Sequence, residues 1–415
     1  MAPRPPDRVT GFACLGCGRE FPPETDAMIC DACEANLDVR YDYDKIGSRI
    51  DRDRIGASRE RSLWRYRELL PLHESSGPPP LPVGGTALLR GGRLAEELGL
   101  PRLYLKDDTT NPTASFKDRA SLVVALRAKE IGVKTISCAS TGNAASSLAG
   151  IAAPLDLRSV IFVPEGAPAP KMTQMLTYGA RVFRVRGTYD DAFDVCAAAT
   201  DRFGWYSRST GYNPYTAEGK KTAAFEIAES LGWEAPDWVL VPTGDGNIAG
   251  GVGKGFLEMA RLGWIERAPR IVLVQAAGAA SLTAAFERGD DRIEAVHPVT
   301  VADSISVGSP RDSRRALRVV RKTGGTAVAV TDEAILRAVG VLARSTGLFA
   351  EPSAAASLAG LWALLEKKTI NPWDRVVLMI TGHGLKDTAT ASRLVEEPPV
   401  IDPDLASVER LLEPR

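Results

Sequence analysis

The sequence predicts an α/β fold with a mainly parallel sheet, preceded by a small cysteine-rich module. Short β-branched runs alternate with Ala-rich amphipathic segments of helical length along most of the chain. Strands that alternate with helices are typical of parallel sheets covered by helices. Four cysteines gathered near the N-terminus mark the module. The 415 residues suffice for two or three domains with buried cores, at roughly 100–200 residues per domain.

Seven short runs are expected to form buried parallel strands, and several of them lead directly into turns rich in Gly, Ser or Thr. In such folds, ligands bind at the carboxyl ends of the strands. A Pro/Gly-rich connector at 75–85 (SSGPPPLPVGG) separates the N-terminal part from this alternating region. The expected strands lie in 134–140, 159–166, 180–187, 238–246, 270–278, 326–332 and 375–384.

Composition and charge argue against two classes of partner. Lys and Arg number 51 and Asp and Glu 52, and this near-balance argues against nucleic acid as the main partner. No stretch reaches the roughly 18 uninterrupted apolar residues of a membrane span. The first residues, MAPRPPDRVTGFACLGCGRE, lack the apolar core of a signal peptide. We therefore expect a cytoplasmic protein that binds neither nucleic acid nor membrane.

Cys14, Cys17, Cys30 and Cys33 form the pattern C-x2-C-x12-C-x2-C. Two C-x2-C turns can direct four thiolates at one metal ion, and the segment around them is too short for a core of its own. We expect a structural zinc ion in a zinc-ribbon-like module over residues 1–45. Two disulfides or four free thiols are the alternatives, and the missing export signal disfavours disulfides. The two remaining cysteines, Cys138 and Cys196, are expected in the core.

The turn at 111–120 (NPTASFKDRA) carries a candidate for amine chemistry. Lys117 lies just inside an expected helix start, with Ser115 as the expected N-cap. Desolvation and the positive end of the helix dipole both favour the neutral amine that a Schiff base requires. The alternative is a surface lysine paired with Asp118.

Three further turns offer polar groups at strand ends. The turn at 138–147 (CASTGNAASS) presents hydroxyls and N–H groups that suit an anion such as a carboxylate, or an ordinary N-cap cluster. The glycines of 241–256 (VPTGDGNIAGGVGKGF) let the backbone approach a phosphate, although Ala249 replaces the third glycine of G-x-G-x-x-G. At 378–387 (LMITGHGLKD), the hydroxyl of Thr381 could hydrogen-bond a ring nitrogen. Plain turns are the alternative for the last two.

The ordered motifs TASFKDR, STGNAAS, the Gly-rich loop, EPSAAASLAG and TGHGLKD resemble those of the pyridoxal-phosphate enzymes of the tryptophan synthase β type, fold type II. The chain is most similar to the threonine synthase branch, some members of which also carry an N-terminal cysteine module. The resemblance runs from about Gly84 to Asp387 and implies two parallel-sheet α/β domains and a homodimer. It implies a large domain from 46–117 and 214–390, a small nested domain from 118–213, and a C-terminal extension at 391–415.

The resemblance also implies a cofactor, pyridoxal 5'-phosphate, and an amino-acid substrate. Lys117 would form the Schiff base and then move protons. Asn143 would hydrogen-bond the 3-oxygen of the cofactor, and Thr381 would face its pyridine nitrogen. The remaining implied contacts are Ser140 and Thr141 for the substrate carboxylate and Gly244, Asp245, Gly246 and Asn247 for the cofactor phosphate.

The implied reaction converts O-phosphohomoserine and water to L-threonine and phosphate, so the leaving phosphate needs a site of its own. The family typically places Asn-Ser before its NPY motif and Arg directly after it, where this chain has Thr210, Gly211 and Thr216. Threonine does not replace a bidentate arginine, and Lys220 or Arg208 is the expected substitute. One alternative is a paralogue acting by β-elimination or β-replacement, as a serine/threonine ammonia-lyase or an O-phosphoserine-dependent synthase. The other is a binding protein on an inactive scaffold.

Overall fold

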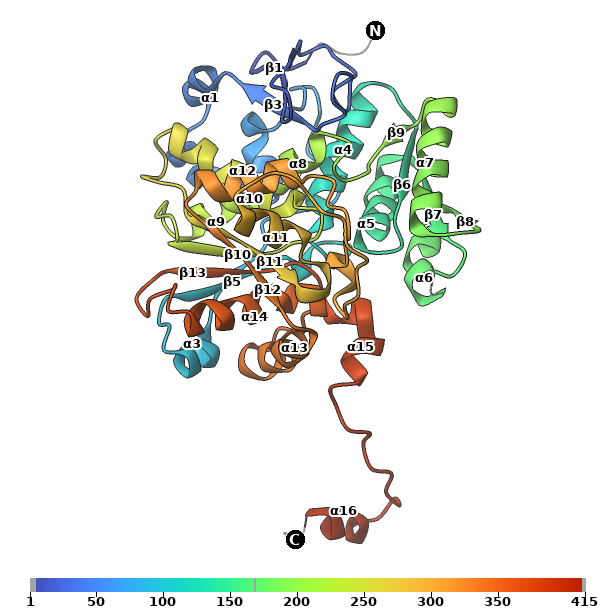
Figure 1. The fold of residues 1–415 in the computed structure, drawn as a ribbon, viewed down its shortest axis with the longest axis vertical. Helices are drawn as coiled ribbons and strands as arrows, with labels where there is room; N and C mark the ends of the chain where they lie inside the picture. Colours follow the sequence, from blue (N-terminus) through green and yellow to red (C-terminus); the bar gives the residue numbers. More distant parts are fainter. Residues whose placement is uncertain (1–4, 168, 413–415) are drawn as a thin grey trace.

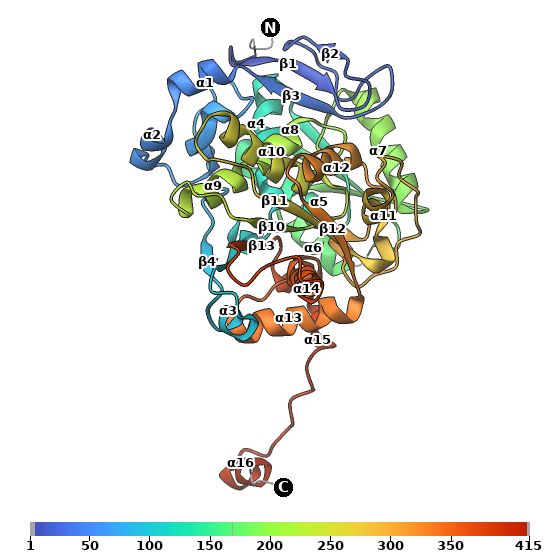
Figure 2. The same ribbon diagram turned by 60° about the vertical axis from the view of Figure 1, so that its left-hand side comes forward.

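The structure is a computed structural model that describes residues 5–167 and 169–412. Within these residues the chain forms three sheets with helices packed around them (Figures 1 and 2). The predicted α/β fold with a mainly parallel sheet is confirmed, and the N-terminal cysteine-containing segment forms a small sheet of its own. None of the helices in the described ranges has the length and apolar character needed to cross a bilayer.

The largest sheet joins strands from distant parts of the sequence. Its members are β4 (Leu88–Arg90), β5 (Leu103–Asp107), β10 (Trp238–Pro242), β11 (Arg270–Ala276), β12 (Thr326–Val330) and β13 (Val376–Ile380). They are ordered β12-β11-β10-β13-β5-β4, all parallel except for β4 at the edge. Because β13 pairs with β5, the turns that follow these two strands lie side by side.

A second parallel sheet of four strands lies in the middle of the chain. It consists of β6 (Thr135–Ala139), β7 (Arg158–Pro164), β8 (Arg181–Val185) and β9 (Tyr206–Ser207), in the order β8-β7-β6-β9. Its helices are α5 (Asn143–Ala152), α6 (Ala169–Thr177) and α7 (Tyr189–Phe203), which gather beside it in Figure 1. The exact limits of a large and a small domain stay a prediction.

The helices around the large sheet carry several of the candidate residues. They are α3 (Gly92–Leu98), α4 (Lys117–Glu130), α8 (Tyr215–Lys220), α9 (Thr222–Ser230), α10 (Asn247–Arg261), α11 (Ser281–Arg288), α12 (Ser313–Lys322), α13 (Asp332–Thr346), α14 (Pro352–Glu366) and α15 (Thr388–Ser392). Helix α4 packs against both α5 and α8 and so links the two parallel sheets. The last helix, α16 (Leu405–Leu412), stands apart from the body in both views.

The N-terminal module is an antiparallel sheet that docks on the chain's own α/β body. Its strands are β1 (Val9–Cys14), β2 (Glu20–Phe21) and β3 (Leu37–Tyr41), in the order β2-β1-β3. Figure 2 shows them above α8, α10 and α12. The hydroxyl of Tyr41 donates to Glu218 at 2.6 Å, and Lys254 pairs with Asp38 at 3.0 Å. The helical segment that follows contains α1 (Tyr43–Arg49), α2 (Arg52–Ala57) and the 3-10 helix η1 (Leu63–Leu69).

All seven predicted strands are present, and Cys138 and Cys196 are buried as expected. Sequence reasoning missed β5, whose sequence LYLKD ends in charged residues. Both charged residues are buried, and Lys106 pairs with Glu226 at 2.6 Å. Such a partner lies far away in the sequence, so the strand pattern alone does not reveal it.

A buried ion cluster fixes the start of α4. Arg119, two residues after Lys117, has no exposed surface, and its guanidinium contacts Asp108 and Glu226 at 2.6 Å each. Lys106 completes the cluster through Glu226. Asp108 directly follows β5, and Glu226 belongs to α9. The cluster therefore holds the first turn of α4 against both elements.

Replacing Arg119 with Met should lower the free energy of unfolding by about 3–5 kcal/mol, since the buried carboxylate of Asp108 loses its charged partner and that of Glu226 keeps only Lys106. Burial would raise the pKa of Glu226, but Arg119 and Lys106 hold it below its ordinary value. The stabilisation is therefore present at neutral pH and lost as the pH falls below about 4. Denaturant unfolding at pH 7 checks this, with Arg93→Met as the control, because Arg93 pairs only at the surface with Glu97. Equal losses in both variants would contradict the role of the cluster.

Candidate active site

Lys117 is the first residue of α4 and lies beside the end of β13. An isolated bridge joins Ser115 to Gly382, and the N–H of Phe116 donates to the carbonyl of Thr381 at 2.9 Å. The predicted cap is wrong, because Phe116 occupies the N-cap position and the buried Ser115 hydroxyl has no hydrogen-bond partner among the residues that the structure describes. Ser115 pairs with Gly382 and lies one residue before the N-cap position, so it does not cap the helix.

The amine of Lys117 is available for chemistry, since it hydrogen-bonds none of the described residues. Burial and the charge of Arg208 lower its pKa, against an opposing effect of two nearby carboxylates. The alternative pairing with Asp118 is wrong. That carboxylate accepts from the N–H and the hydroxyl of Thr113 instead.

A small cavity brings together residues from four turns that the sequence places far apart. Lys117 and Thr381 line it from the ends of α4 and β13, and Asn143 lines it from the start of α5. The Gly-rich loop after β10 forms another wall. Its predicted site residues are Lys117, Asn143, Lys220, Gly244, Asp245, Gly246, Asn247 and Thr381.

The Gly-rich loop ends in an uncapped helix N-terminus. Gly246 is the N-cap of α10, with a φ of 91° that favours glycine, and no side chain caps the helix. The first-turn N–H groups of such a helix can bind an anion. The carboxylate of Asp245 accepts from the N–H of Arg311 at 3.2 Å, so a backbone donor offsets its charge.

Asn143 contacts a carboxylate that sequence reasoning left without a role. Its amide donates to both oxygens of Glu351 at 3.0 Å and to the hydroxyl of Ser304 at 3.3 Å. Glu351 is the N-cap of α14, and its burial raises its pKa, although Asn143 and Ser304 oppose this. The motif EPSAAASLAG is evident in the sequence, but only the tertiary structure brings its glutamate to Asn143.

A larger cavity of about 420 Å³ adjoins the small one and shares Asn143, Ser304 and Glu351 with it. Thr141 lines it, whereas the Ser140 hydroxyl accepts from the N–H of Gly142. Its other walls come from α5, α6 and the 3-10 helices η5 (Asp303–Ile305) and η6 (Gly384–Asp387). The cavity therefore lies between the helices of the small sheet and those of the large one.

This chain lacks the residues with which the family is expected to bind the leaving phosphate. The threonines at two of these positions hydrogen-bond other groups of the chain instead. Thr216 is buried and donates to the carbonyl of Asn213 at 2.8 Å. Thr210 lines the small cavity and accepts from Arg208 at 3.0 Å. Arg208 itself is fully buried, and its Nη2 has no hydrogen-bond partner among the described residues.

These features fit pyridoxal phosphate. One small cavity contains an amine with a lowered pKa, a helix N-terminus without a side-chain cap, and a strand end that carries a hydroxyl group. With the cofactor bound, they would supply a covalent anchor, donors for a phosphate and a partner for a ring nitrogen.

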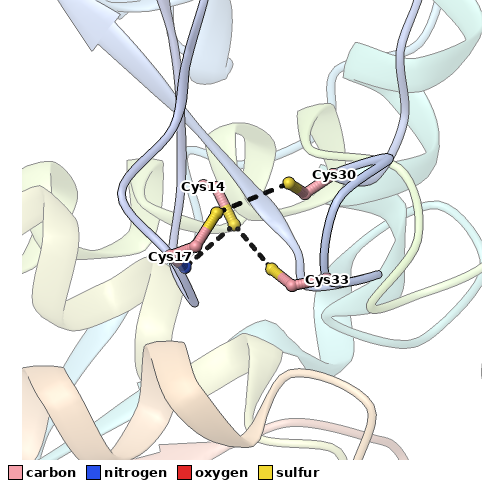
Figure 3. Close-up of side chains that lie close together, drawn as sticks. All are labelled: Cys14, Cys17, Cys30 and Cys33. Carbon is pink, nitrogen blue, oxygen red and sulfur yellow. Dashed lines mark hydrogen bonds between the residues drawn. The ribbon is translucent and has the colours of Figure 1, made fainter.

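The four N-terminal cysteines form a second candidate site (Figure 3). All four sulfurs lie within 4.8 Å of one another, and the Cys14–Cys33 and Cys17–Cys30 separations are 3.4 and 3.7 Å. Four Zn–S bonds of about 2.3 Å in a tetrahedron place the sulfurs about 3.8 Å apart. The four thiols are thus close enough to one another to bind one metal ion together.

Comparison with known proteins agrees with this geometry. Residues 80–382 match the family described as pyridoxal-phosphate dependent enzyme. The threonine synthase of Methanocaldococcus jannaschii is 40% identical over 402 residues, which is 96% of this chain and 98% of the relative. The threonine synthase of Mycobacterium tuberculosis is 36% identical over 349 residues, 83% of this chain and 94% of the relative.

Solved structures with low identity share the fold. The processed threonine deaminase isoform 2 of Solanum lycopersicum superposes with a TM-score of 0.65 at 23% identity, over 75% of this chain and 87% of that one. The diaminopropionate ammonia lyase of Escherichia coli gives a TM-score of 0.64 at 19% identity, over 94% and 98% of the two chains. The match over residues 80–382 and the similarity across nearly the whole chain place this protein in the pyridoxal-phosphate dependent enzyme family, in its threonine synthase branch.

Proposed function

We propose that this chain converts O-phosphohomoserine and water to L-threonine and phosphate. The observation that carries the proposal is the Lys117 amine, which has a lowered pKa, hydrogen-bonds none of the described residues and shares one cavity with the uncapped N-terminus of α10. The relatives named threonine synthase support the choice of substrate, because they match along almost the full chain.

When bound, the cofactor supplies an electron sink that stabilises negative charge on the substrate's α-carbon. In the proposed arrangement, Lys117 holds the cofactor covalently, and its amine afterwards removes and returns protons on the substrate. Its lowered pKa favours the neutral form that accepts a proton. Thr381 would face the ring nitrogen, and Asn143 would donate to the 3-oxygen.

The substrate carboxylate would lie at the end of β6, where Ser140 and Thr141 precede α5. Thr141 lines the larger cavity, which adjoins the small one at Asn143 and therefore offers room for an amino acid next to the cofactor. Glu351 borders both cavities and accepts from Asn143, so it keeps that amide in place.

We further propose that Cys14, Cys17, Cys30 and Cys33 bind a structural zinc ion. The four ligands leave no open coordination position, so the ion would stabilise the module and take no part in catalysis. The support is the packing of four sulfurs within 4.8 Å. Assembly as a homodimer in the cytoplasm also stays a prediction from the family resemblance, and light scattering on the purified protein tests the dimer.

A second candidate is ammonia release from serine or threonine, or replacement on O-phosphoserine. The observation that favours it is the absence of an arginine at Thr216, whose buried hydroxyl is bonded to Asn213. Without that arginine, the leaving phosphate of O-phosphohomoserine loses a bidentate partner.

Incubation of the holoenzyme with O-phosphohomoserine should release phosphate and threonine in equal amounts. Phosphate is measured colorimetrically and the amino acid by chromatography in the same sample. Serine, threonine and O-phosphoserine serve as comparison substrates. A 2-oxo acid and ammonia from serine or threonine, with no phosphate from O-phosphohomoserine, would contradict the proposal and support the second candidate.

A further inference from the structure

Lys220 lies at the Gly-rich loop, a position that its sequence neighbours do not reveal. It is the last residue of α8 and has no exposed surface. Its amine donates to the side-chain oxygen of Asn247, the first residue of α10. It lines the small cavity together with Lys117, Gly244 and Gly246. Lys220 is therefore next to the uncapped helix N-terminus that suits a phosphate.

The other buried lysines show what Lys220 lacks. Lys106, Lys221 and Lys254 each contact a carboxylate at 2.6 Å. Lys220 makes no ion pair within the part of the chain that the structure describes. An ammonium group has three donors, and here only one is used, on a neutral amide. A buried cation of this kind calls for an anion.

The charges around Lys220 point to an anionic ligand as well. Burial, followed by the positive charges of Lys117 and Arg208, lowers the pKa of Lys220 well below its ordinary value. Asp245 and Asp312 oppose this effect. However, Asp312 is engaged by Arg315 at 2.9 Å, so its charge is already partly balanced. A phosphate group at the α10 N-terminus would supply the missing negative charge.

We propose that Lys220 donates to the phosphate of the cofactor and is a specificity-determining residue for the phosphorylated form of pyridoxal. This inference rests on the proposed function, which needs that cofactor, and it assigns Lys220 to the cofactor rather than to the leaving phosphate of the substrate. Asn247 and Asp312 act as positioning residues, because the amide of Asn247 donates to Asp312 while its oxygen accepts from Lys220.

The hydrogen bonds that position the partner of Lys220 extend to the N-terminal module. Arg315 donates to Asp312 and also to the carbonyl of Leu37 at 2.8 Å and to the carboxylate of Asp38, both on β3. A continuous set of hydrogen bonds thus runs from the module to Asn247. This set holds the amide of Asn247 in one orientation, so that it accepts from the amine of Lys220.

The test compares the binding of pyridoxal phosphate and of pyridoxal, which lacks the phosphate, to the apoenzyme. For Lys220→Gln, we expect pyridoxal phosphate to bind about 10- to 100-fold more weakly, and pyridoxal to bind as it does to the unchanged chain. Lys220→Arg should retain most of the preference because it keeps the charge. Lys129→Met is the control, since Lys129 is exposed near the far end of α4 and lines neither cavity.

Cofactor fluorescence gives both dissociation constants without any turnover. Equal weakening of both ligands by Lys220→Gln would overturn the proposal and indicate a merely structural role. Unchanged cofactor binding with a raised KM for O-phosphohomoserine would also overturn it and assign Lys220 to the substrate. If Lys220→Gln does not fold, loss of the preference in Lys220→Arg overturns the proposal and its retention supports it. Failure of the proposed function would show separately, as a wild-type enzyme that binds pyridoxal phosphate but releases no threonine.

Discussion

Replacing Lys117 with alanine should abolish threonine formation and the visible absorbance of the lysine-bound cofactor. Loss of proton transfer alone lowers rates by about 10²- to 10⁴-fold, and loss of the covalent anchor adds to this. The amine of Lys117 hydrogen-bonds none of the described residues, so its removal breaks no side-chain hydrogen bond among them. Absorbance spectra and product analysis on the purified variant check both effects.

The matched control is Lys129→Ala, on the exposed end of the same helix. It should keep the spectrum and the rate, because Lys129 lies a full helix length from the cavity. A Lys117→Ala protein that is folded and still makes threonine would rule out the proposed mechanism. Melting temperature measured on both variants separates a loss of chemistry from a loss of fold.

Replacing Cys30 with serine should remove one equivalent of zinc per chain and lower the melting temperature by at least about 5 °C. Cys30 is fully buried beside three other thiols, so a missing thiolate opens the tetrahedron and exposes the metal to exchange. Activity should fall as well, because the module supplies Asp38 to the hydrogen bonds that reach Asn247. Elemental analysis and thermal unfolding provide the measurements.

Cys196→Ala is the control for this second experiment, since Cys196 is buried beside the four-stranded sheet and far from the module in sequence. It should retain the full zinc content. A wild-type protein without zinc whose melting temperature falls on reduction would instead point to disulfides, and one that is insensitive to both chelator and reductant would point to four free thiols.

The sequence by itself determined the fold class, the family and most of the candidate site. Alternating β-branched runs and amphipathic segments predicted the parallel strands, because both patterns are local and repeat with the period of their element. The order of five short motifs identified the family, and C-x2-C spacing identified the four thiols. Each of these signals is contained in a short stretch of the sequence, so no knowledge of the tertiary structure is needed to see it.

Only the tertiary structure decided which residues meet across long sequence separations. The pairing of Asn143 with Glu351 and the burial of Lys106 beside Glu226 depend on strand order. The position of Lys220 also depends on the fold. The NPY stretch predicts a substrate contact for Lys220, but the packing of α8 against α10 brings its amine to Asn247. A buried charge is stable only with its partner in place, and that partner is chosen by the fold, not by the neighbouring sequence.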